Sequence, residues 1–103
     1  MKAAEVTLVR VYINEGSGKV KSLLNFLHDE SKVHGVTVFR GITGFGKSGR
    51  YHSSTLMDMS LDLPVVIEFF ELPDLAGPII EKLSSELDPG HIVFWNARMN
   101  VGE

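Results

Sequence analysis

The sequence contains no cysteine, no long apolar run and no excess of positive charge. Without cysteine there is no disulfide framework, no thiolate nucleophile and no zinc site built on cysteine, and a reducing compartment is favoured. No apolar stretch reaches the length of a membrane span, and residues 1–5 do not open a signal peptide. The net charge of −3 argues against nonspecific binding to nucleic acid. We therefore expect a cytoplasmic protein that does not insert into the membrane.

Segments typical of strands and helices alternate along the 103 residues, which suffice for one domain. β-branched and aromatic residues predict strands at residues 6–13, 36–42, 64–71 and 91–98. Apolar residues at helical spacing predict one helix from Lys19 that ends at Gly35, and a second helix capped by Asp74. The order β-α-β-β-α-β predicts an α+β, ferredoxin-like fold, with an antiparallel four-stranded sheet and two helices on one face.

The predicted strands carry apolar side chains on both faces of the sheet. In the third strand Val65 and Ile67 lie on one face, and Val66 and Phe70 lie on the other. Two helices cover only one face of such a sheet, so we expect the second face to pack against another copy of the chain. The alternative is that the long connection after the second strand covers part of this face.

A glycine-rich segment, residues 41–50, follows the second predicted strand. Its glycines can turn backbone N–H groups toward an anion, and Lys47 and Arg50 add charge that a phosphate can use. A solvated hairpin tip is the alternative explanation for the same composition. The segment opens a connection at about 43–63, much longer than the roughly two to five residues that join antiparallel neighbours. We therefore expect this long connection to be functional.

Several short motifs occur in a fixed order along nearly the whole chain. They are Gly-Val-Thr-Val at 35–38, Gly-Phe-Gly-Lys at 44–47 with His52 beyond it, Leu-Pro at 63–64 with Ile-Glu-Phe at 67–69, and Gly-His-Ile at 90–92. This order resembles the PII (GlnB-like) signalling family, and most closely its short branch known as a domain of unknown function. The resemblance implies one PII-like domain over residues 1–103, assembled as a homotrimer.

The resemblance also implies an adenine nucleotide (AMP, ADP, ATP or cyclic AMP) in the cleft between neighbouring subunits, with no required cofactor. Together with the cations of the glycine-rich segment, it predicts a nucleotide site made of Thr37, Gly44, Phe45, Gly46, Lys47, Arg50, Glu68, Gly90, His91 and Arg98. No catalytic residue is predicted. The implied mechanism is a population shift, in which the nucleotide orders the long connection and this connection meets a target protein, such as a membrane transporter or an enzyme.

Two positions depart from the family pattern. His91 stands where the family has a phosphate-binding lysine, and a histidine is mostly neutral at pH 7. This departure weakens the case for ATP and leaves AMP, ADP or a cyclic nucleotide. Lys47 and Ser48 replace the Arg-Gln pair of the family, whose glutamine helps to bind metal and 2-oxoglutarate. Sensing of 2-oxoglutarate is therefore not expected.

Two other kinds of protein share the predicted topology. A small ferredoxin-like enzyme acting on a phosphate-containing substrate, such as an acylphosphatase, would need an arginine after the first strand, and residues 14–18 contain none. An RNA-recognition module has a Gly-Phe-Gly fragment in its third strand, but residues 47–50 read as a loop and the chain is acidic. The four histidines show no metal-ligand spacing, so no metal site is predicted.

Overall fold

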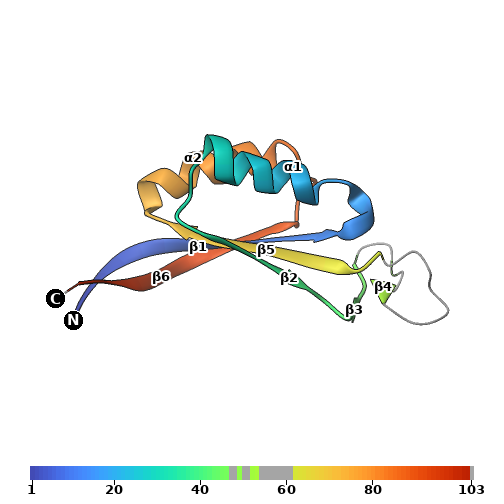
Figure 1. Cartoon of the computed structure of the whole chain (residues 1–103), viewed down its shortest axis with the longest axis horizontal. Helices are drawn as coiled ribbons and strands as arrows, with labels where there is room; N and C mark the ends of the chain where they lie inside the picture. Colours follow the sequence, from blue (N-terminus) through green and yellow to red (C-terminus); the bar gives the residue numbers. More distant parts are fainter. Residues whose placement is uncertain (47–48, 50–51, 54–61, 103) are drawn as a thin grey trace.

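The computed structural model describes residues 1–46, 49, 52–53 and 62–102. Four strands form an antiparallel sheet in the order β2-β5-β1-β6, with β1 at Lys2–Asn14, β2 at Val36–Arg40, β5 at Pro64–Glu71 and β6 at Ile92–Gly102. The short strands β3 (Thr43–Gly44) and β4 (His52–Ser53) pair separately. Helices α1 (Val20–Asn25) and α2 (Pro73–Ser84) lie on the same side of the four-stranded sheet (Figure 1). The predicted ferredoxin-like fold is confirmed.

The side chains of the central strand β1 alternate between the two faces of the sheet. Val9, Val11 and Ile13 point toward the helices and are buried, while Arg10 and Tyr12 lie on the opposite face. The helices complete a core made of Val9, Val11, Ile13, Leu23, Leu27, Val65, Ile67, Phe69, Ile79 and Leu83. Each fully buried aliphatic side chain of this kind contributes about 1.5–3 kcal/mol to folding. The sheet and helices are therefore held together on one face only.

The first helix ends earlier than the sequence predicts. Its last turn, Phe26–Glu30, is π-helical, and the N–H of Ser31 donates to the carbonyl of Phe26 at 2.9 Å. The predicted end at Gly35 is wrong, because the chain leaves the helix at Lys32, which adopts a left-handed conformation with φ 52°. A left-handed residue stops a helix wherever it occurs, and lysine takes this role less often than glycine. The presence of a glycine therefore predicted the end of the helix at the wrong residue.

The second helix begins one residue before its predicted cap. Leu72 occupies the N-cap position and Pro73 the first helical position, where the missing N–H of proline costs no hydrogen bond. Asp74 therefore lies in the first turn, where its negative charge is favourable, and its predicted role as the cap is wrong. Pro78 lies inside α2, yet the helix continues to Ser84. None of the helices that the structure describes is long and apolar enough to cross a membrane.

The strands β1 and β6 both extend beyond their predicted bounds. Lys2 pairs with Gly102, and the pairing continues along both strands toward the centre of the sheet. Because β5 ends at Glu71, these extensions form a two-stranded ribbon that projects past the helices and carries both chain ends (Figure 1). The ribbon places Arg98 opposite Glu5, toward the projecting end of the sheet.

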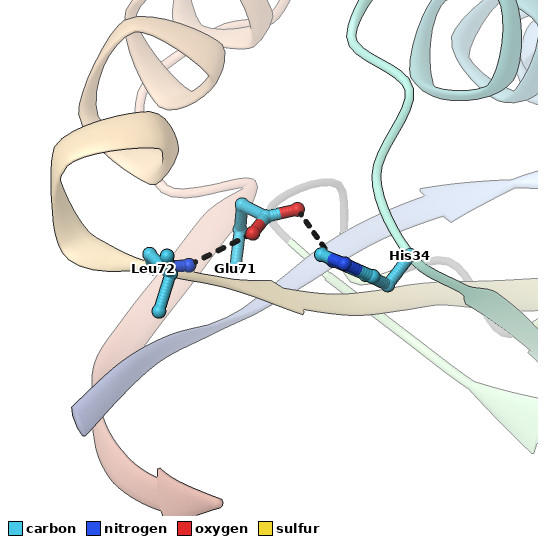
Figure 2. A network of polar contacts seen from close by, with 3 residues as sticks. All are labelled: His34, Glu71 and Leu72. Carbon is cyan, nitrogen blue, oxygen red and sulfur yellow. Dashed lines mark hydrogen bonds and ion pairs between the residues drawn. The ribbon is translucent and has the colours of Figure 1, made fainter. Parts of the chain in front are cut away.

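A buried carboxylate joins the end of β5 to the start of α2. The Glu71 residue is only 4% exposed, and its Oε1 accepts a hydrogen bond from the backbone N–H of Leu72 at 3.0 Å. Its Oε2 lies 3.2 Å from Nδ1 of His34, whose side chain is 80% exposed (Figure 2). Glu71 therefore links the α2 N-terminus to the segment that enters β2. Among the described residues, no buried side-chain N or O atom lacks a hydrogen-bond partner.

We expect Glu71→Ala to lower the free energy of unfolding by about 1–3 kcal/mol, because it leaves a partly buried N–H without an acceptor. Glu71→Gln should cost less, since its amide oxygen can still accept from Leu72. His34→Ala is the matched control, and its effect should stay below about 1 kcal/mol because the imidazole is exposed. Urea unfolding monitored by circular dichroism measures all three. Equal losses for Glu71→Ala and His34→Ala would contradict the proposed role of Glu71.

Candidate functional site

A groove of about 620 Å³ lies at the edge of the sheet where the long connection begins. Four segments that are distant in sequence line it. They are the end of β1 (residues 12–14), the start of β5 (64–66), part of the glycine-rich segment (41 and 43–46) and the turn before β6 (89–91). Strand register brings them together, since Asn14 pairs with Pro64 and the N–H of Tyr12 donates to the carbonyl of His91 at 2.8 Å. The volume lies within the range of small-molecule sites, roughly 300–1,000 Å³.

Two glycines let the glycine-rich segment pass close to Pro64. A Cβ added at Gly41 would lie 2.8 Å from Cγ of Pro64, and one added at Gly44 would lie 3.2 Å from the same atom. Gly46 differs, because a Cβ added there meets no described atom within 4 Å. Packing of the chain itself therefore requires glycine at 41 and favours it at 44. At position 46, the described packing of the chain gives no reason for glycine.

His91 is oriented in the groove by its contacts with Tyr12. Its ring nitrogen Nδ1 lies 2.7 Å from the carbonyl oxygen of Tyr12. A carbonyl oxygen only accepts hydrogen bonds, so Nδ1 carries the hydrogen and donates it. The preceding residue, Gly90, has φ 95°, a conformation that favours glycine and turns the chain into β6. The turn and the hydrogen bond together hold the imidazole at the groove wall.

The far end of the long connection is fastened beside the same groove. A 3₁₀ turn, η1 (Glu15–Ser17), follows β1, and its first two N–H groups donate to the carbonyl of Leu63 at 2.9 Å and to Oδ1 of Asp62 at 2.6 Å. Arg40, at the end of β2, forms an ion pair with Glu15. The two hydrogen bonds thus connect the end of β1 to the point where the connection re-enters the sheet, and the ion pair connects it to the end of β2.

Five of the ten residues predicted for the nucleotide site line this groove. The predicted residues that line it are Gly44, Phe45, Gly46, Gly90 and His91. Lys47 and Arg50, which the sequence assigns to the same site, lie outside the described residues. In all, residues 47–48, 50–51 and 54–61 of the predicted connection lie outside the described residues.

Three other predicted site residues lie away from this groove. Thr37 and Glu68 are paired across β2 and β5, on the sheet face opposite the helices. Arg98 lies in the projecting ribbon, and at about 3.3 Å per strand residue it is roughly 20 Å from His91. One copy of the chain therefore does not bring Thr37, Glu68 and Arg98 into the groove.

The open face of the sheet carries an arginine between two aromatic rings. Nε of Arg10 donates to Oε1 of Glu68 at 2.7 Å, and its guanidinium carbon lies 5.9 Å from the ring centre of Phe39 and 6.0 Å from that of Trp95. The hydrogen bond to Glu68, followed by one to Tyr12, raises the pKa of Arg10 above its usual value. Phe39 and Trp95 are 47% and 43% exposed, so the cluster is open to contact.

Sequence reasoning missed this cluster and one side of the groove. Arg10 stands between the buried Val9 and Val11, and a charge at that position of an otherwise apolar strand is a signal that could have placed it on the open face. The groove residues Asn14 and Pro64 end one strand and begin another, but their proximity follows from strand register. No local signal in the sequence could have shown that proximity.

Two further features of the described part of the chain bear on the choice of site. A hollow between α1 and α2, lined by Leu23 and Leu83 among others, has a volume of about 240 Å³ and is the smaller of the two. Within residues 1–46, 49, 52–53 and 62–102, no group of three or more His, Cys, Asp or Glu side chains could hold a metal ion. The groove beside His91 is therefore the candidate functional site.

Comparison with known proteins gives the family. Residues 6–99 match the model of the DUF190 family, described as Uncharacterized ACR. A UPF0166 protein of Aquifex aeolicus (strain VF5) is 38% identical over 66 residues, which are 62% of this chain and 65% of that relative. A second UPF0166 protein of the same organism is 27% identical over 90 residues, which are 84% of this chain and 86% of the relative.

Solved structures show the same fold at low sequence identity. CPII, a nitrogen regulatory PII-like protein from Thiomonas intermedia K12 bound to ADP, AMP and bicarbonate, has a TM-score of 0.72 at 20% identity, covering 99% of this chain and 92% of CPII. A PII-like signaling protein from Thermus thermophilus has a TM-score of 0.65 at 17% identity, covering 96% and 91%. CutA1 from Oryza sativa has a TM-score of 0.61 at 14% identity, covering 98% and 85%. The chain belongs to the DUF190 family and has the fold of PII-like proteins.

Proposed function

We propose that this chain is a noncatalytic, nucleotide-responsive regulator that binds an adenine nucleotide in the groove at the root of the 43–63 connection. The observation that carries the proposal is the convergence of the open backbone at Gly46 and the oriented imidazole of His91 on one cavity of ligand size. Backbone N–H groups near glycine suit a phosphate, and so does a histidine ring in its protonated form. The presence of ADP and AMP in CPII, which shares the fold, supports an adenine nucleotide.

We propose further that the protein is a homotrimer in which copies bury the open face of the sheet. Phe39, Phe70 and Trp95 are 47%, 37% and 43% exposed on the face that no described helix covers. Clustered exposed aromatic side chains of this kind mark protein interfaces. Arg10 and Glu68 lie among them, and their mutual hydrogen bond reduces the cost of removing both charges from water.

An assembly would also explain the predicted residues that a single chain keeps away from the groove. Arg98 pairs with Glu5 in the ribbon of β1 and β6, and this ribbon projects past the helices (Figure 1). We propose that Arg98 meets a nucleotide held in the groove of a neighbouring copy, and that Thr37 and Glu68 approach that nucleotide from the open face. The site would then lie between subunits, as the resemblance implies.

The output of the regulator, in this proposal, is the 43–63 connection. Its root is joined to the groove wall through η1 and Asp62, so a ligand that contacts the wall can favour one arrangement of the root over another. The connection would then bind a target protein in the cytoplasm, such as a membrane transporter or an enzyme. The PII-like neighbours support this regulatory role.

Gly46→Val tests the groove. The new side chain should block the backbone approach and weaken ADP binding at least tenfold, about 1.4 kcal/mol, while the fold survives because the position is open. Gly35→Val is the matched control, since an added Cβ there also meets no described atom within 4 Å and the residue lies outside the groove. Isothermal titration calorimetry with ADP compares the variants. Equal affinity in Gly46→Val and the wild type would place the site elsewhere.

Light scattering tests the assembly. We expect a mass near three times that of the 11.4 kDa chain. Trp95→Asp should shift the protein toward monomer, because it places a charge in the proposed interface and removes an aromatic ring beside Arg10. Leu75→Asp, at a 53% exposed position on α2, should leave the mass unchanged. A wild-type protein that stays monomeric at all concentrations would contradict the trimer.

A further inference from the structure

The orientation of His91 decides which ring nitrogen a ligand meets. Nδ1 donates to the carbonyl of Tyr12 at 2.7 Å, and no described residue forms a hydrogen bond with Nε2. In the neutral ring Nε2 is therefore an acceptor, and in the imidazolium it is a donor that carries part of a positive charge. A phosphate oxygen is repelled by the first form and attracted by the second.

The protonation state of His91 matters for anion binding because few charged groups among the described residues surround it. Among the described residues that line the groove, Tyr12 on β1 carries the one other titratable side chain, and neither the start of β5 nor residues 41–46 add an acid or a base. Asp88 lies in the turn before His91 and is exposed, but it does not line the groove. Lys47 and Arg50 are outside the described residues. No fixed positive charge is therefore found in the described lining.

We propose that His91 makes anion binding in this groove proton-coupled: the phosphate of the ligand is bound together with one proton at Nε2 of His91. The proton comes from water, no covalent bond to the ligand forms, and both the proton and the anion leave on release. This inference rests on the proposed nucleotide site and names its pH regulation. It assigns to His91 a role that a lysine at the same position would not have.

The direction of the effect follows from linkage. A bound anion stabilises the imidazolium, so it raises the pKa of the ring in the complex above that of the free protein. Affinity is then full below the pKa of the free protein and is lost as the pH rises through the pKa of the complex. Histidine is the side chain that commonly changes charge between about pH 5 and pH 8, so affinity at pH 6 should exceed affinity at pH 8.

Two variants separate charge from structure. His91→Asn keeps an amide N–H that can donate to the carbonyl of Tyr12, but it cannot become a cation. His91→Lys carries a positive charge throughout this pH range. Wild-type affinity for ADP should fall about tenfold or more relative to His91→Asn between pH 6 and pH 8. The ratio between His91→Lys and His91→Asn should stay nearly constant, and this comparison removes the titration of ADP itself.

The proton can be counted directly. Calorimetry of ADP binding near pH 7.5, in buffers with different heats of ionisation, should show that the wild type takes up more protons than His91→Asn. Lys47→Ala should keep this difference, because the coupled group is His91. Equal proton uptake and equal affinity in the wild type and His91→Asn would overturn the inference and leave nucleotide binding intact.

A second probe covers the case in which ADP does not bind. Sulfate keeps a constant charge between pH 6 and pH 8, and the proton resonances of the His91 ring report its titration. Saturating sulfate should raise the titration midpoint of His91 by about one pH unit. If no variant binds ADP, the proposed function is wrong, and a raised midpoint with sulfate would still support a proton-coupled anion site. A midpoint that neither anion moves overturns the inference.

Discussion

The pairing of β1 with both of its neighbours is the constraint on which the rest of this structure depends. β1 pairs with β5 from Thr7 to Asn14 and with β6 from Lys2 to Val11, so one strand sets the position of both others. This register brings the ends of three strands to one edge and forms the groove there. Shifting β1 by one residue would turn its buried side chains to the open face and separate the groove walls.

The same alternation leaves the second face of the sheet without a helix. On the covered face, Val9 and Ile67 are fully buried in the core. On the open face, Arg10 on the central strand β1 donates a hydrogen bond to Glu68. Its guanidinium group also lies near the rings of Phe39 and Trp95. A charged pair among exposed aromatic residues keeps this face compatible with water.

In the groove, the glycine-rich backbone passes close to Pro64, and the described lining carries few charged groups. Packing against Pro64 explains Gly41 and helps to explain Gly44, while the open position of Gly46 has no explanation in the described packing of the chain and fits the approach of a ligand. His91, held by Tyr12, is the one histidine among the described residues that line the groove. The hydrogen bonds of η1 to Asp62 and Leu63 then join the end of β1, which lines the groove, to the long connection. Binding and output would thus share one set of contacts.

Local patterns in the sequence alone determined the strands, the helices and their order, because the spacing of apolar side chains is set by the backbone within a few residues. The glycine-rich composition around Gly46 predicted an anion site there, whereas His91 was predicted as a site residue only through the resemblance to the PII family. The tertiary structure decided that Asn14 lies beside Pro64, that Glu71 is buried, and that Nδ1 of His91 bonds to the carbonyl of Tyr12. Each of these depends on strand register and on contacts between residues far apart in the chain, and local propensity carries no information about such distant pairings.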